Sequence, residues 1–359
     1  MPIPPGLLLA IVLPGLVFEA AFRTDPAMLR PTAAVVFILA IPGVVLVAAI
    51  VAVVLAATTE LTTTEGFLVG AMVAATDPAA VLSTFRRIRV PDRLATMVEM
   101  ESLVNDGTGI VLFAVAVDVL AGDGSIDLGG SAVSFVLRVV GGAALGAGLG
   151  WLGGRLSGKV DDHLTELTVT VVLAYGTYLL AEALGVSGVI ATLVAASTLG
   201  ATAGERLTLE AREAIDIVWE FAAFLLTAGV FVLVGVSIAP DALVHAAGAI
   251  GWGIAGVLVA RAVVVFGIVG GGAAAIRAAR RGESSRTSEP LLPGRWLPVL
   301  FWAGLRGAVS VALALSIPAS VPHRDVIQGI TFGIVLFTLI VQGATTGWVV
   351  RRSGVAIEA

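Results

Sequence analysis

Two short stretches inside long apolar runs carry oxygen-bearing side chains that could bind a cation. The first is TDPAAV, residues 76–81, and the second is ESLVND, residues 101–106. Ionisable side chains in mid-membrane cost about 2.5–3.5 kcal/mol even on a lenient insertion scale, so they normally face a partner or a wet cavity. The acids Asp77 and Asp106 are therefore the first candidates for a functional role.

The second stretch predicts a polar face on a helix. Residues four apart share a face, which brings Glu101 and Asn105 beside Ser102 and Asp106. Carboxylate, amide and hydroxyl oxygens are hard ligands, suited to Na+, Li+ or a proton rather than to a soft metal. A purely structural polar network is the alternative. It is strong for Glu101, because Arg261 is a natural ion-pair partner, and weaker for the two aspartates, because few spare cations remain.

Pro78 predicts a gap in the helix beside Asp77. Proline has no N–H, so the carbonyl of Ala74 loses its helical partner, and the ring disturbs the preceding turn. We expect the helix to loosen around residues 74–77 and to expose backbone carbonyls beside the carboxylate. Secondary transporters coordinate Na+ or H+ with such carbonyls at mid-membrane. A plain kinked helix is the alternative.

A second broken helix is predicted near the C-terminus. In GLRG, residues 304–307, two glycines flank Arg306 inside another apolar run. One interrupted segment towards each end of the chain indicates an inverted repeat, as in many transporters.

The composition requires a membrane environment for these elements. Of 359 residues, 58% are hydrophobic and 13% charged, about half the charge of a soluble domain, and the mean hydropathy is +1.02. Cysteine is absent, which excludes thiolate chemistry and disulfides, and the three histidines show no metal-ligand spacing. No cofactor site and no nucleic-acid signature is visible. We expect an all-α polytopic membrane protein without enzymatic activity.

Eleven hydrophobic segments are predicted, each near the length that spans a bilayer. They are 3–22, 33–57, 66–84, 95–120, 131–154, 165–184, 187–203, 217–238, 243–272, 297–317 and 327–350. Seventeen of the 21 basic residues follow odd-numbered segments, and one, Arg324, follows an even-numbered segment. By the positive-inside rule, the C-terminus is cytoplasmic and the N-terminus is outside.

Three further stretches have structural interpretations. Residues 204–216 are expected to form a surface helix, and the basic, Ser/Pro-rich residues 277–295 a cytoplasmic linker. In segment five a glycine recurs every fourth residue, which predicts a groove for close helix packing. These glycines are Gly142, Gly146, Gly150 and Gly154.

The motifs together resemble the cation:proton antiporter-1 family, the sodium/proton exchangers. The matching pieces are LPGLVFEAAF (13–22), ATDPAAVLSTF (75–85), ESLVNDGTGIVLF (101–113), VWEFAAFLLTAGVFVLVG (218–235), Arg261 and GLRGAVSVALAL (304–315). They occur in the family's order and span nearly the whole chain. ATDP followed about twenty residues later by ESLxND is a specific combination.

The resemblance implies a role for each matching residue. Asp106 would take either the cation or the proton, and Asp77, Ser102 and the carbonyl of Thr76 would complete a Na+ shell. Asn105 would shape the site. It stands where some related antiporters carry a second aspartate, so the implied cycle is electroneutral. Glu101 would pair with Arg261, and Arg306 would stabilise the crossing of the broken helices beside Pro78.

The resemblance also implies an architecture. Residues 1–352 would form one exchanger domain, with a mobile core at 33–120 and 243–350 and a dimerising scaffold at 1–30 and 131–238. Family members usually have about thirteen membrane helices, and LPGLVFEAAF resembles the third. Two N-terminal helices are therefore expected to be missing. Thr227 and Ala228 stand where many relatives have Asn-Ser.

The implied function is exchange of a monovalent cation (Na+, or else Li+ or K+) for H+ across the cell membrane, serving sodium transport and pH homeostasis. Burial and a neighbouring carboxylate both favour the protonated form of an acid, so Asp106 is expected to exchange its proton for a cation near neutral pH. The partners would be these ions, the lipid bilayer and a second copy in a homodimer. The alternatives are a Na+-coupled solute symporter, a truncated non-transporting protein and, least favoured, an intramembrane aspartyl protease, whose Gly-x-Gly-Asp context is missing.

Overall fold

The computed structural model describes residues 5–23, 32–122, 128–157, 162–203, 209–237, 243, 246–274 and 292–357. These residues are helical apart from their connections, and no strand occurs among them. The helices are α1 (Pro5–Arg23), α3 (Ala33–Ala40), α4 (Pro42–Thr58), α5 (Thr63–Ala74), α6 (Ala79–Ile88), α7 (Asp92–Ala121), α8 (Leu128–Ser157), α9 (His163–Ala183), α10 (Gly188–Ala203), α11 (Leu209–Ser237), α13 (Ala247–Ala262), η1 (Val263–Gly270), η3 (Gly294–Trp296), α15 (Leu297–Trp302), α16 (Ala308–Leu315), α17 (Arg324–Phe337), η4 (Thr338–Gln342) and α18 (Gly343–Arg352).

The predicted membrane character is confirmed. Within the described part of the chain, eight helical stretches are long and apolar enough to cross a bilayer, and α10 is a shorter apolar helix. Four of the eight combine consecutive elements, namely α3 with α4, α5 with α6, α13 with η1, and α17 with η4 and α18. The helices α15 and α16 are short because the chain between them is not helical.

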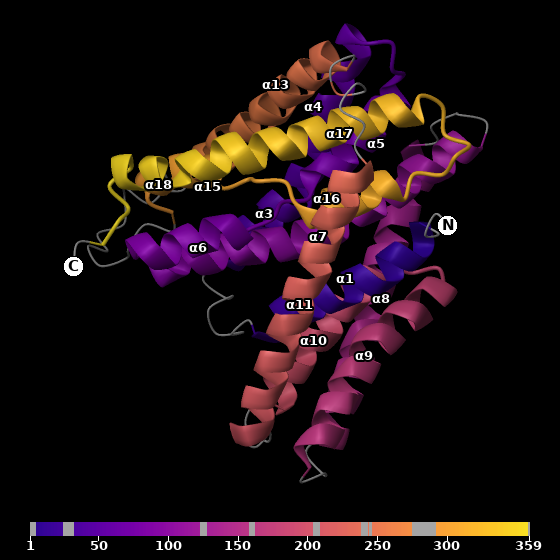
Figure 1. The fold of residues 1–359 in the computed structure, drawn as a ribbon, viewed down its shortest axis with the longest axis vertical. Coiled ribbons are helices and arrows are strands. Elements are labelled where there is room, and N and C mark those ends of the chain that lie inside the picture. Colours follow the sequence, from indigo (N-terminus) through magenta and orange to yellow (C-terminus); the bar gives the residue numbers. More distant parts are fainter. Residues whose placement is uncertain are drawn as a thin grey trace.

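Two groups of helices can be followed in Figure 1. The first contains α4, α5, α13 and α17, which pack against one another, and the second contains α1, α8, α9, α10 and α11. Helix α7 contacts both groups, since it packs on α3 and α5 and also on α8 and α10. Helix α7 therefore lies where the two groups meet.

The first helix break occurs at Pro78, as predicted. Helix α5 ends at Ala74 and α6 begins at Ala79, with non-helical backbone between them. The carbonyl of Ala74, which has no helical N–H partner, accepts a hydrogen bond from Arg306 Nη1 at 2.9 Å. Because Pro78 has no N–H, one helical hydrogen bond is lost. The Arg306 side chain, which is distant in the sequence, supplies the donor in its place.

The second break, between Trp302 and Ala308, crosses the first. The backbone N–H of Asp77 donates to the carbonyl of Leu305 at 2.8 Å, which joins the two non-helical stretches directly. Gly307 allows this approach, because a Cβ at that position would overlap the Asp77 carboxylate. Gly304 has a similar role, since its Cβ would lie 3.0 Å from Arg261 Nε.

Three of the four glycines of the series on α8 line the predicted packing groove. Helix α10 lies in it, and a Cβ on Gly142 would lie 2.7 Å from the carbonyl oxygen of Ser187. Added methyl groups on Gly146 and Gly150 would overlap the backbone at Ala191 and Ala195. Close approach of two backbones needs small residues at the contact.

Two other predictions concern polar connections. The surface helix expected at 204–216 is not separate from residue 209 onwards, because α11 runs without interruption from Leu209 to Ser237. No proline or glycine separates the polar start of this helix from its apolar part, so the helical hydrogen bonds continue. Most of the linker expected at 277–295, residues 277–291, lies outside the described residues.

Raising the pH is expected to remove a small stabilising contribution of His323. Thr62 and Glu65 form a capping box at the start of α5, and Glu65 Oε1 lies 2.9 Å from His323 Nδ1. This hydrogen bond, with the charges of Glu65 and Glu60, raises the pKa of His323. A pKa raised by folding stabilises the folded state below the unfolded value of about 6.5, and the contribution disappears as the pH rises through the folded value.

The variant His323→Asn tests this, because asparagine is neutral and tolerates the left-handed backbone conformation at this position (φ 50°). Thermal unfolding in detergent should show a larger difference between the variant and the parent protein at about pH 5.5 than at about pH 9. An equal difference at both pH values would contradict a role for the charged pair.

Candidate functional site

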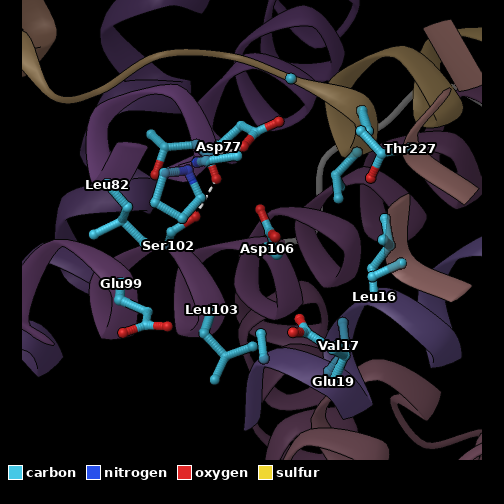
Figure 2. Close-up of a pocket in the computed structure, with 18 of the residues that line it drawn as sticks. Leu16, Val17, Glu19, Asp77, Leu82, Glu99, Ser102, Leu103, Asp106 and Thr227 are labelled. Atoms are coloured by element: carbon cyan, nitrogen blue, oxygen red, sulfur yellow. Dashed lines mark hydrogen bonds between the residues drawn. The ribbon is translucent and has the colours of Figure 1, made fainter. Parts of the chain in front are cut away.

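A cavity of about 960 Å³ borders α1 and α11 of the second group of helices. Its walls come from α1 and α11 on one side, and from α6, α7, α16 and the first break on the other. Figure 2 shows Asp77 and Asp106 on this cavity, with Thr227 of α11 on the wall beyond Asp106. The two aspartates that the sequence singled out therefore share one space.

Helix α7 fixes the first break through Thr76. Asn105 Oδ1 accepts from the backbone N–H of Thr76 at 3.1 Å, and Asn105 Nδ2 donates to the Thr76 hydroxyl at 2.7 Å. The Ser102 hydroxyl donates to the Thr76 carbonyl. All three side chains are buried, so these bonds replace the helical hydrogen bonds that the break removes.

Asp77 is held at the start of α6. Its Oδ1 accepts from the backbone N–H of Ala79 at 3.0 Å, and its own N–H is bonded to Leu305. A carboxylate at a helix N-terminus is stabilised by the free N–H groups there. The side chain is nevertheless only partly buried, because it also borders the cavity.

Asp106 carries an oxygen with no partner. Its Oδ1 is buried and makes no hydrogen bond in the described part of the chain. The helical spacing places Asp106 four residues after Ser102, and both border the cavity. An orphaned carboxylate oxygen in a polar recess is satisfied by a proton or by a bound cation. Asp77, Ser102 and Thr76 line the same cavity, and their carboxylate, hydroxyl and carbonyl oxygens are of the hard type that alkali cations prefer.

The Arg306 side chain bridges the two breaks. Its side chain is buried, with 1% exposure, and Nη1 donates to the carbonyls of Ala74 and Ala75 at 2.9 and 3.2 Å. The Ser310 hydroxyl lies 3.5 Å from the same Ala75 carbonyl. The carbonyl oxygens at the first break therefore accept hydrogen bonds from Arg306 and from residues that border the cavity.

Glu101 points away from the cavity to Arg261. The guanidinium contacts both carboxylate oxygens, with Nη2 at 2.9 Å from Oε2, and Nη2 also donates to the Leu300 carbonyl at 2.8 Å. Both side chains are at least 93% buried. This arrangement links α7, α13 and α15, and it agrees with the structural interpretation of Glu101.

The cavity also has a charged rim, and Glu99 is a member of it that the sequence patterns did not single out. Glu99 borders it on α7, and Arg23 of α1 contacts Glu19 at 2.8 Å and Glu220 of α11 at 3.3 Å. Extending the helical face backwards from Asp106 by seven residues would have identified Glu99. The contact between Arg23 and Glu220 could not be foreseen, because it depends on how α1 and α11 pack.

The chain is similar to known proteins over nearly its whole length. The family model described as "Sodium/hydrogen exchanger, transmembrane" matches residues 3–352. The low-affinity Na(+)/H(+) antiporter NhaS1 of Synechocystis sp. is 35% identical over 97% of this chain and 64% of its own length. The Na(+)/H(+) antiporter NhaP of Pseudomonas aeruginosa is 34% identical over 96% of this chain and 81% of its own length.

The fold is also found in solved structures. The sodium proton antiporter MjNhaP1 of Methanocaldococcus jannaschii at pH 8 superposes with a TM-score of 0.74 and 22% identity, covering 99% of this chain and 88% of that one. The chain spans slightly less than two thirds of the length of the two Synechocystis relatives, NhaS1 and NhaS2 (64% and 62%). The crossed breaks, the motifs and the match over nearly all residues agree, and the chain belongs to the sodium/hydrogen exchanger family.

Proposed function

We propose that this protein exchanges a monovalent cation, Na+ in the first instance, for H+ across the cell membrane. The observation that carries the proposal is the unpartnered, buried Oδ1 of Asp106 on a cavity shared with Asp77. The similar proteins of Synechocystis sp. and Pseudomonas aeruginosa, which are named as Na+/H+ antiporters, support it.

The chemistry is competition for one carboxylate. In the protonated state the Asp106 oxygen carries H+, and in the cation-loaded state it ligates Na+ together with Asp77, Ser102 and the Thr76 carbonyl. A negatively charged side chain without either ligand is expensive in a low-dielectric site, so the empty site should cross the membrane poorly. Exchange then needs no ATP, since each ion's gradient drives the other.

The packing suggests which parts move. The cavity lies between α1 and α11 on one side and α6, α7 and α16 on the other, which corresponds to the proposed division into scaffold and core. Movement of the core against the scaffold would expose the site to alternate sides, as in other transporters with broken helices. Arginines at the ends of α1, α6 and α18 indicate that these ends are cytoplasmic.

The scaffold has an apolar outer surface that suits lipid or a second copy of the chain. On α8 several large side chains are more than half exposed, and α11 has a similar surface. They include Val133, Val136, Leu137, Val140, Ile217 and Phe221. We propose that a homodimer, where it forms, uses this surface.

Addition of Na+ to acid-loaded proteoliposomes containing the purified protein is expected to cause prompt proton release, followed with a pH-sensitive dye inside the vesicles. Because Asn105 is neutral, one exchanging charge remains and the cycle is one cation for one proton. A membrane potential, worth about 2.3 kcal/mol per charge per 100 mV, should then leave the rate unchanged.

The same vesicles supply the control. Vesicles without protein should show no Na+-dependent release, and choline chloride should not replace NaCl. Absence of release would contradict the antiporter function. Marked acceleration by an imposed potential would contradict only the one-for-one cycle.

A further inference from the structure

Thr338 is a buried threonine at a special position in the last helical stretch. Helix α17 ends at Phe337, and Thr338 begins the five-residue π-helix η4. Its side chain is 1% exposed. The hydroxyl donates to the carbonyl of Val335 at 3.0 Å and accepts from the backbone N–H of Arg306 at 3.0 Å. Short π-helical turns inside α-helices frequently occur at functional sites.

The Arg306 N–H needs this acceptor. Residue 306 lies in the second break, where no helical carbonyl is available to it. A buried N–H without a partner costs about 1–3 kcal/mol. The Thr338 hydroxyl supplies the partner, and its own proton is directed to Val335, so a lone pair faces the break.

The Leu305–Arg306 peptide, whose N–H bonds to Thr338, also contacts the residues of the proposed cation site. The carbonyl of Leu305, on the same peptide unit as the Arg306 N–H, accepts from the backbone N–H of Asp77 at 2.8 Å. The Arg306 side chain binds the carbonyls of Ala74 and Ala75. A tilt of the 305–306 peptide would therefore displace both the Asp77 backbone and the free carbonyls beside it.

We infer that Thr338 is a positioning residue for ion exchange, which acts by fixing the Leu305–Arg306 peptide against the first break. The inference rests on the proposed function and adds to it a residue that lies outside the cavity lining. Thr338 neither touches the ion nor titrates. Its hydroxyl determines how accurately Asp77 is presented to the ion.

The chain provides a matched control on the same helix. Thr331 lies two turns earlier on α17, is fully buried, and donates its hydroxyl to Ile327 of its own helix at 2.9 Å. Replacing Thr331 by valine thus removes a hydroxyl of the same type and burial without touching either break. Any effect of Thr338→Val beyond that of Thr331→Val reports the bond to Arg306.

The first experiment measures Na+-dependent proton release from proteoliposomes for Thr338→Val, Thr338→Ser and Thr331→Val. Loss of the bond to a buried N–H should raise the Na+ concentration for half-maximal rate about tenfold in Thr338→Val, whereas Thr338→Ser and Thr331→Val should stay within about twofold of the parent protein. Equal values for the two valine variants, or a serine variant as weak as Thr338→Val, would overturn the inference.

A second measurement does not depend on transport. Hydrogen exchange of peptides covering residues 75–78 and 303–307 should be faster in Thr338→Val than in Thr331→Val. The reason is that the amides of Asp77 and Arg306 are both hydrogen-bonded at the crossing of the two breaks. If Thr338→Val does not fold, Thr338→Ala, which removes the hydroxyl without adding bulk, takes its place. Unchanged exchange in both peptides would refute the positioning role.

The two proposals can fail separately. A parent protein that releases no protons on Na+ addition contradicts the antiporter function. The hydrogen-exchange comparison still decides whether Thr338 fixes the Leu305–Arg306 peptide. An active parent protein in which Thr338→Val behaves as Thr331→Val contradicts the Thr338 inference alone.

Discussion

Asp106→Asn is expected to reduce Na+-dependent proton release to the rate of protein-free vesicles. The amide is nearly the same size as the carboxylate but neither ionises nor takes up a proton in this pH range. The variant can therefore offer no exchangeable proton, and its neutral oxygen is a weak ligand for Na+. The measurement is the Na+ addition to acid-loaded proteoliposomes, with the protein amount in each vesicle preparation matched.

A second aspartate on the same helix is the control for this loss. Asp118 lies twelve residues further along α7, is 64% exposed and pairs with Arg138 at 2.8 Å. Asp118→Asn should retain the exchange rate of the parent protein, because Asp118 lies outside the cavity lining. Release that persists in Asp106→Asn, or that disappears equally in both variants, would remove Asp106 from the central role.

Local chemistry was sufficient to predict the breaks and the acidic face. Pro78 lacks an N–H, and this property alone places the end of α5 at Ala74 within a residue or so of the expectation. Helical periodicity likewise placed Ser102 and Asp106 on one face, and both border the cavity. These features depend on neighbours within a turn or two, which is the range over which sequence patterns are informative.

Features that depend on packing between distant segments were not predictable. Gly307 was noted as a helix breaker, but its closeness to the Asp77 carboxylate joins residues 230 positions apart. Thr338 gave no signal at all, because threonines are common in apolar helices and usually bond to their own helix, as Thr331 does. Only the crossing of the two breaks makes one hydroxyl different from the other.

At the start of α11 the sequence pattern led to a wrong helix boundary. The polar residues 209–216 were expected to form a separate surface helix, yet they continue into the apolar part of α11. A change of composition marks where a helix leaves the apolar environment, whereas the helix itself ends only where backbone bonding fails. Composition and helix boundaries therefore report different properties.

Breaking the ion pair between Glu101 and Arg261 is expected to destabilise the protein strongly. Arg261→Met should lower the free energy of unfolding by about 3–5 kcal/mol, because it leaves the Glu101 carboxylate buried without its partner. The Leu300 carbonyl also loses its donor. Unfolding titrations in mixed micelles, followed by circular dichroism, measure this change. An exposed pair is the control: Arg138→Met removes the partner of Asp118 and should change stability by less than about 1 kcal/mol.

The double variant Glu101→Met/Arg261→Met separates an unpaired charge from lost packing. Removing both charges leaves no buried ion, so most of the lost stability should return, as for other buried pairs replaced by apolar residues of similar volume. The coupling between the two substitutions should then be large and of opposite sign to the single effects. A double variant as unstable as Arg261→Met would mean that the guanidinium acts mainly through Leu300 and the packing of α15, and that the buried charge of Glu101 is tolerated without it.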